Sequence, residues 1–83
     1  MFTVYAIVSE SSGKIYIGQT IDINLRLKQH NTEGEEHLSK YTKQNKGPWK
    51  LIYTELLETR TKALIREKQL KSFRGREFIK KLI

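Results

Sequence analysis

Residues 2–31 read FTVYAIVSESSGKIYIGQTIDINLRLKQHN, and this stretch predicts two strands followed by a helix. Residues 2–8 and 14–19 are rich in aromatic and β-branched side chains, which favour strands. Between them lies Ser11-Ser12-Gly13, a sequence typical of turns. We therefore expect the two runs to pair as a β-hairpin.

Side chains alternate between the two faces of a strand, which makes the hairpin's geometry predictable. If the loop holds an even number of residues, Tyr5 and Tyr16 project from the same face of the sheet. Ile15 and Ile17 then project from the opposite face.

Asp22 is a good N-cap for a helix that runs to about Asn31, itself a residue suited to a helix end. Two pairs of residues spaced by four are expected on separate faces: Ile23 with Leu27 toward the core, and Arg26 with His30 elsewhere.

The second half of the chain predicts one more strand and two more helices. Residues 32–47 are polar and hard to interpret; we expect a loop that can include a short helix. The third strand is expected at Trp49–Thr54, with Trp49, Leu51 and Tyr53 on one face. A helix capped by Thr59 or Thr61 contains, in order, Ala63, Leu64, Glu67, Leu70 and Lys71.

A last short helix is expected after Gly75, from Glu77 to Ile83, burying either Phe78 and Leu82 or Ile79 and Ile83. The predicted fold class is α+β, a small three-stranded and mainly antiparallel sheet flanked by helices, as a single domain over residues 1–83.

Composition limits the possible functions. The chain has no Cys, so it forms no disulfide and no Cys-based zinc site. Its net charge of +7, from 16 Lys and Arg against 9 Asp and Glu, suits a phosphate-rich partner or an anionic membrane surface. We find no apolar stretch of membrane-spanning length and no signal peptide, so we expect a soluble, cytoplasmic protein with no membrane partner.

Five residues are candidates for chemistry: Tyr5, Tyr16, Arg26, His30 and Glu67. Each also has an ordinary structural interpretation, such as a core tyrosine, a histidine at a helix end or a surface charge. Their joint order and spacing carry more information than any of them singly.

As a set, these residues resemble the GIY-YIG nucleases. The second motif is intact as Tyr16-Ile17-Gly18, and the first reads Thr3-Val4-Tyr5. The helix ending in Gln29-His30-Asn31, the segment Pro48–Tyr53 and the segment Ala63–Lys71 are similar to later parts of short stand-alone members. The resemblance covers residues 2 to about 73. The chain is also similar to the N-terminal nuclease domain of the excinuclease incision subunit.

The resemblance implies a metal-dependent endonuclease. Glu67 would be the only protein ligand of one divalent cation, Mg²⁺ or Mn²⁺, which are hard ions that prefer oxygen. Arg26 would bind the scissile phosphate through its fork of donors. The general base is left open between Tyr5 and Tyr16, and His30 would be the base or orient it. Gly18 would allow close approach of the backbone at the site.

Two departures from the family pattern stand out. Thr3 replaces the first Gly, a tolerated variation. Many members also carry an Asn about a dozen residues after the Glu, whereas this chain reads Arg76-Glu77-Phe78-Ile79-Lys80 there.

The expected partner is DNA, with RNA left open, bound largely through phosphate contacts that are insensitive to sequence. The residues expected to bind nucleic acid are Gly18, Lys28, Arg66, Lys68, Lys71, Arg74 and Arg76. Because no base-reading motif is present, we expect selectivity for branched, nicked or single-stranded substrates rather than for sequence.

Two other functions compete with catalysis. One is a nucleic-acid-binding module of the same fold with weak or no activity, which the missing Asn favours. The other is a protein-interaction adaptor whose charge is incidental. A zinc hydrolase is poorly supported, because His30 and His37 are the only histidines and there is no Cys. The sequence leaves the oligomeric state open.

Overall fold

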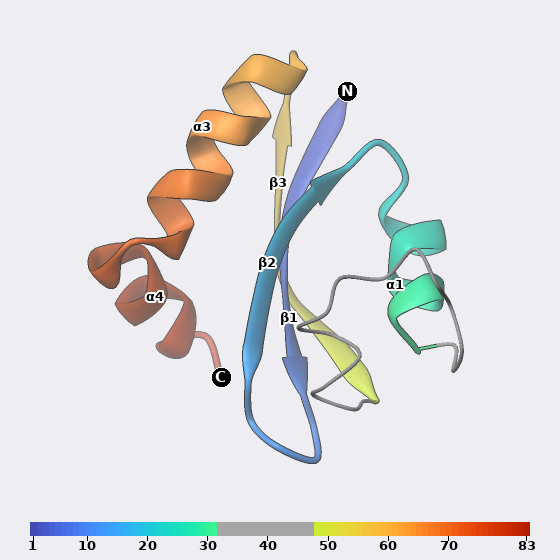
Figure 1. Cartoon of the computed structure of the whole chain (residues 1–83), viewed down its shortest axis with the longest axis vertical. Helices are drawn as coiled ribbons and strands as arrows, with labels where there is room; N and C mark the ends of the chain where they lie inside the picture. The colour runs from blue at the N-terminus through green and yellow to red at the C-terminus, as the bar shows by residue number, and fades with distance from the viewer. Residues whose placement is uncertain (32–47) are drawn as a thin grey trace.

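The computed structural model describes residues 1–31 and 48–83 (Figure 1). Its elements are, in chain order, β1 (Phe2–Ser9), β2 (Ile15–Thr20), α1 (Ile23–Asn31), β3 (Trp49–Leu57), α3 (Arg60–Lys71) and α4 (Phe73–Lys80). They form the predicted α+β fold, with helices on both faces of one three-stranded antiparallel sheet. The short helix that was allowed for within residues 32–47 lies outside the described residues.

The strand order is β2-β1-β3, so β1 is the central strand and is covered on both faces. This position explains why β1 is buried at seven consecutive residues instead of alternating between buried and exposed. None of the helices in the described part of the chain is long and apolar enough to cross a membrane.

The hairpin has the predicted geometry. Residues 10–13 form its loop, and the Ser9 amide donates to the Lys14 carbonyl over 2.9 Å. Gly13 provides the left-handed backbone that closes the turn, with φ of 74°. The loop holds an even number of residues, and Tyr5 and Tyr16 share a face as predicted.

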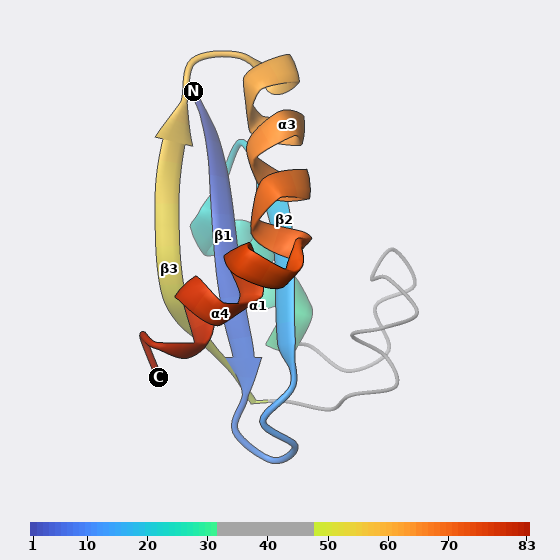
Figure 2. The same ribbon diagram turned by 90° about the vertical axis from the view of Figure 1, so that its left-hand side faces the viewer.

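Two apolar layers enclose the sheet. On one face, α3 and α4 contribute Ala63, Leu70 and Ile79, which pack on Val4, Ala6 and Ile17. Figure 2 shows α3 lying along the β1–β2 side of this face and α4 crossing toward β3. On the other face, Ile23 and Leu27 of α1 pack against Tyr5, Ile7 and Trp49, as predicted from their spacing.

The predicted face of Tyr53 is wrong because β3 contains a β-bulge. Ala6 pairs with Tyr53 but Ile7 pairs with Leu51, so Ile52 is an extra residue on β3. The bulge leaves Trp49 and Leu51 on the α1 face and moves Tyr53 to the opposite one. The strand also continues to Leu57, three residues beyond the predicted end.

The α3–α4 junction corrects the predicted start of the last helix. Thr59 caps α3 as expected, accepting from the Lys62 amide over 3.2 Å. However, α4 begins at Phe73, with Ser72 as its N-cap, and Gly75 lies inside it. A Cβ on Gly75 would lie 2.4 Å from the Leu70 Cα, so glycine is needed there for close packing of two helices, not to end one.

The burial predicted for the last helix also needs correction. Ile79 is completely buried, but its expected companion Ile83 is 67% exposed. Phe78 and Leu82 are each about half exposed, and the Phe78 ring contacts Tyr53 edge-on at 5.5 Å between ring centroids. The helix ends at Lys80, before Leu82 and Ile83 can extend its apolar face.

Candidate active site

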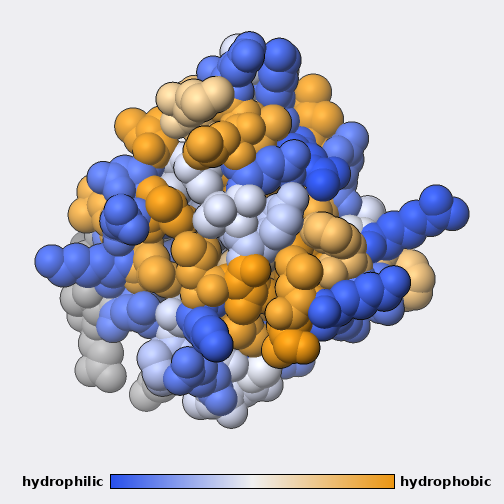
Figure 3. Space-filling view, turned by 180° about the vertical axis from the view of Figure 1, so that it is seen from behind, coloured by the Kyte–Doolittle hydropathy of each residue, from blue (hydrophilic) through white to orange (hydrophobic). Residues whose placement is uncertain are grey.

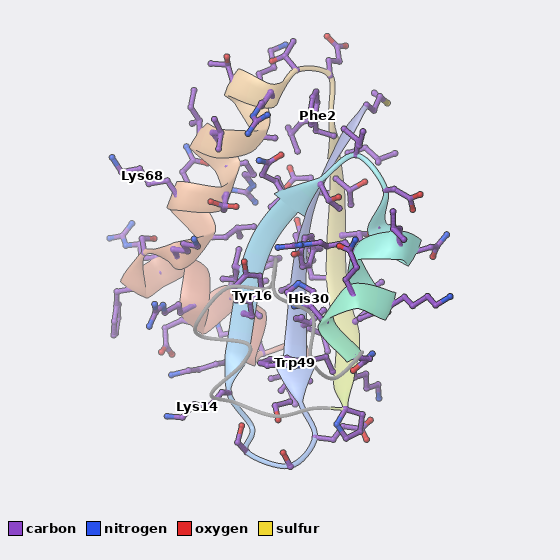
Figure 4. All side chains as sticks on the ribbon, turned by 45° about the vertical axis from the view of Figure 1, so that its right-hand side comes forward. Phe2, Lys14, Tyr16, His30, Trp49 and Lys68 are labelled. Atoms are coloured by element: carbon purple, nitrogen blue, oxygen red, sulfur yellow. The ribbon has the colours of Figure 1, made fainter. Side chains whose placement is uncertain are left out.

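Four of the five candidate residues meet on the α1 face of the sheet. Tyr5 comes from β1, Tyr16 from β2, and Arg26 and His30 from α1. The Tyr5 hydroxyl lies 2.9 Å from His30 Nε2, and Arg26 Nε donates to the same hydroxyl over 3.3 Å. Figure 4 shows Tyr16 and His30 side by side between the sheet and α1.

Aromatic rings surround His30 and bury it. The Tyr16 and His30 ring centroids are 4.9 Å apart, and Tyr5 contacts the imidazole edge-on at 5.9 Å. Trp49 borders the same imidazole at 6.3 Å. These contacts leave His30 only 4% exposed, so its Nε2 is held close to the Tyr5 hydroxyl.

Trp49 and Asn31 are parts of this site that the sequence analysis missed. The Asn31 side chain accepts from the Trp49 amide over 2.6 Å and donates to the Trp49 carbonyl over 3.2 Å. This two-point contact fastens the end of α1 to the start of β3, and so holds His30 against Trp49. Nothing in the sequence distinguishes this Asn from one that merely ends a helix.

Burial controls the ionisation of Tyr5. Loss of solvent raises the pKa of Tyr5 to about 12, opposed by the hydrogen bond from Arg26 and reinforced by the nearby Tyr16 and Glu67. Burial also disfavours the charge of Arg26, but hydrogen bonds and charge interactions with Tyr5 and Tyr16 outweigh it and raise the pKa of Arg26. At neutral pH the site therefore contains a neutral phenol beside a permanent cation.

Gly18 makes room for the two tyrosines. It is directly opposite Tyr5 in the β1–β2 pair. A Cβ there would lie 2.8 Å from the Tyr5 hydroxyl oxygen and 3.0 Å from Tyr16 Cε1. The residue that we expected at the nucleic-acid interface therefore lies beneath the tyrosine rings, where its lack of a side chain sets their positions.

Glu67 approaches the site from the other side of the sheet. It lies on α3, which packs against β1 and β2, and its side chain is 20% exposed. Its charge acts on Tyr5, while its Oε2 lies 3.4 Å from Lys71 Nζ. The structure thus joins Tyr5, Arg26 and His30 by hydrogen bonds, and brings Glu67 within electrostatic range of Tyr5.

The donor set suits a hard cation and does not suit zinc. No group of three or more His, Cys, Asp or Glu that could hold a metal occurs within residues 1–31 and 48–83. A single carboxylate fits an ion such as Mg²⁺ that keeps most of its waters. Lys71 provides a competing positive charge at the same carboxylate.

The residues expected to bind nucleic acid do not form one surface. Arg66 Nε contacts the Glu55 carboxylate at 2.7 Å, and Tyr53 donates to that carboxylate over 3.1 Å. The hydrogen bond with Glu55 raises the pKa of Arg66, whose guanidinium connects α3 to β3.

The other basic residues predicted to bind nucleic acid lie on the surface. Lys28 is exposed on α1, while Arg74 and Arg76 are exposed on α4. Figure 4 shows Lys68 projecting from α3 away from Tyr16 and His30. Lys71 is also exposed and pairs with Glu67. Their contacts with nucleic acid stay a prediction.

A family model described as the GIY-YIG catalytic domain matches residues 1–80. The chain belongs to the GIY-YIG family. The resemblance noted from the Tyr16-Ile17-Gly18 motif is therefore confirmed, and the family is of nuclease type.

This GIY-YIG chain is also similar to curated bacterial proteins. UPF0213 proteins of Staphylococcus aureus strains Mu3, Mu50 and N315 are each 40% identical to it over 67 residues. The matched region covers 81% of this chain and 77% of each relative. No solved structure gives a significant match.

Proposed function

We propose that this GIY-YIG domain is a metal-dependent endonuclease that hydrolyses phosphodiester bonds of DNA. The observation that carries the proposal is the chain of contacts from Arg26 Nε through the Tyr5 hydroxyl to His30 Nε2. It combines a cation able to hold a phosphate with a proton donor and acceptor pair, in a setting from which water is largely excluded.

Arg26 would bind the scissile phosphate. A guanidinium has five N–H donors, of which one goes to Tyr5 and one to the Gln29 side chain over 3.3 Å. The remaining donors can face a phosphoryl oxygen and stabilise the charge that builds up there. Because Tyr5 accepts from Arg26, phosphate and attacking water would be gathered around the same hydroxyl.

Tyr5 and His30 would remove the proton of the attacking water together. With a pKa of about 12, Tyr5 is protonated at neutral pH and cannot accept a proton without releasing its own. The His30 nitrogen at 2.9 Å can take that proton while the phenol oxygen accepts one from water. The hydroxide attacks phosphorus, the bond to the leaving oxygen breaks, and that oxygen takes a proton from solvent.

Tyr16 and Glu67 would complete the site. Tyr16, whose ring centroid is 6.2 Å from that of Tyr5, would orient the attacking water. Glu67 would hold Mg²⁺ or Mn²⁺, which when bound neutralises charge on the phosphoryl oxygens. Lys71 competes with the cation for the Glu67 carboxylate, and once displaced it would contact the DNA backbone.

The test is nicking of supercoiled plasmid with Mg²⁺ or Mn²⁺, comparing wild type with Glu67→Gln and Arg26→Ala. Glu77→Gln is the matched control, because Glu77 is also paired with a lysine, Lys80, but lies on α4. We expect metal-dependent nicking by wild type and Glu77→Gln, and its loss in the other two variants. Equal nicking by all four proteins would show that the activity comes from elsewhere.

A second candidate is a nucleic-acid-binding module without activity, and the Glu67–Lys71 ion pair favours it. An ammonium at the carboxylate gives α3 a stable state without metal, and the chain has no Asn at 76–80. This function predicts salt-sensitive DNA binding that Arg26→Ala weakens, with no scission of plasmid, branched or single-stranded substrates.

A further inference from the structure

Phe73 differs from every other aromatic residue in the described parts of the chain. Its side chain is 80% exposed, the highest value among the large apolar residues there. The other rings are placed in the core, in the cluster around His30 or in the Tyr53–Phe78 pair. In Figure 3, apolar atoms gather over β3 and its surroundings, next to the core, whereas Phe73 belongs to the α3–α4 corner.

Hydrogen bonds and close packing hold the corner that carries Phe73. Ser72 accepts from the Gly75 amide over 3.2 Å and donates through its hydroxyl to the Gln69 carbonyl over 2.5 Å. Gly75 packs so closely on Leu70 that no side chain fits between them. A ring on such a corner loses little backbone freedom when a partner binds, which lowers the entropic cost of binding.

Basic residues flank Phe73 in the sequence. Lys71 lies two residues before it, Arg74 follows it directly, and Arg76 lies three residues after it, one turn along α4. Glu77, four residues after Phe73, is paired with Lys80. Within the described part of the chain, Arg74 and Arg76 form no ion pair. A second copy of this corner would be repelled by like charge, whereas a polyanion with flat apolar surfaces complements both the charge and the ring.

We propose that Phe73 is a stacking site for an unpaired nucleobase of a nucleic acid, with Arg74 and Arg76 binding the adjacent phosphates. Glu67 lies on α3, and Phe73 follows six residues later as the first residue of α4, so the two can be at most about 20 Å apart. A base stacked on Phe73 would thus lie within about 20 Å of Glu67. The inference rests on the proposed function in assuming a nucleic acid partner, and it specifies substrates with unpaired bases near the cut.

The test is the affinity of full-length protein for a short single-stranded DNA and for its duplex, measured by fluorescence anisotropy in EDTA so that no cleavage occurs. The variants are Phe73→Ala, Phe73→Trp and the control Ile65→Ala, which removes an exposed apolar side chain of α3 instead. Circular dichroism verifies the fold of each variant.

We expect Phe73→Ala to weaken single-strand binding about tenfold, within the range for loss of one stacked base. Duplex binding should change less than about twofold, because paired bases are not available for stacking. Phe73→Trp should restore the affinity, and the indole emission at position 73 should be quenched by the single strand but not by the duplex.

Three outcomes would overturn the proposal. Phe73→Ala could lose affinity equally for single strand and duplex, it could lose affinity for neither, or wild type could fail to bind the single strand. Binding to phosphatidylserine vesicles that depends on Phe73, without a Phe73 effect on DNA, would assign the corner to a membrane surface instead. A Phe73-dependent single-strand preference in a protein that never nicks DNA would support this inference while refuting the nuclease.

Discussion

Asn31 lies at the exposed end of α1, yet removing its side chain should destabilise the domain strongly. Asn31→Ala removes two hydrogen bonds to the Trp49 backbone, of 2.6 and 3.2 Å. Trp49 is 3% exposed, so its amide and carbonyl have little access to water when the amide side chain is absent. A buried group left without a partner costs about 1–3 kcal/mol.

Because part of the loss can be recovered by local rearrangement, we expect about 2–3 kcal/mol in the free energy of unfolding. A domain of this size loses about 4–8 °C in Tm per kcal/mol, so the expected fall is about 8–24 °C. Thermal unfolding followed by circular dichroism measures the change in Tm, and urea unfolding measures the change in the free energy of unfolding. Asn24→Ala, at an exposed position of the same helix, is the control and should change Tm little.

Asn31→Asp refines the test. The carboxylate can still accept from the Trp49 amide but cannot donate to the Trp49 carbonyl, which it repels. Its stability should therefore lie between wild type and Asn31→Ala. If Asn31→Ala unfolds within about 2 °C of wild type, the clamp contributes less than about 0.5 kcal/mol, and α1 must be held by its apolar face alone.

Three further perturbations test the site. Gly18→Ala should reduce the free energy of unfolding by about 1–3 kcal/mol and weaken nicking, because the new methyl group meets the Tyr5 hydroxyl at 2.8 Å. Urea unfolding measures the first effect and the plasmid assay the second. The pKa of Tyr5 is raised to about 12 in the folded state, so its contribution to stability is present below pH 10 and is lost as pH rises toward 12. The free energy of unfolding of wild type should therefore fall more steeply than that of Tyr5→Phe between about pH 10 and 12. Parallel curves of the two proteins would refute the shift. Lys71→Ala removes the competing charge at Glu67 and should tighten Mn²⁺ binding severalfold by calorimetry, whereas unchanged affinity would mean that the ion does not use Glu67.

The sequence predicted the α1 face of the sheet well, because local signals determine it. The turn at Ser11-Ser12-Gly13 sets the hairpin register, and the register places Tyr5 and Tyr16 on one face. Asp22 caps α1, accepting from the Leu25 amide over 3.1 Å, and the spacing of Ile23 and Leu27 sets which face of the helix packs on the sheet.

The errors arose where tertiary packing overrides a local rule. The bulge at Ile52 breaks an alternation that looks regular from Trp49 to Thr54. Gly75 was interpreted as a helix break, but its neighbour Ser72 makes the break and Gly75 serves the packing. Neither feature is visible without knowing which backbone lies opposite.

Arg66 and Glu67 show why part of the site could not be predicted from sequence. Adjacent residues on a helix point about 100° apart, so one face of α3 cannot present both. The hydrogen bond from Arg66 to Glu55 holds that side chain toward β3, while the burial of Ala63 and Leu70 against the sheet sets the rotation of the helix about its axis. With that rotation fixed, Glu67 is partly buried and close enough for its charge to act on Tyr5. In the sequence Arg66-Glu67-Lys68 the three charges look equivalent, and only the fold separates Arg66, which pairs with Glu55 on β3, from Glu67, whose charge acts on Tyr5.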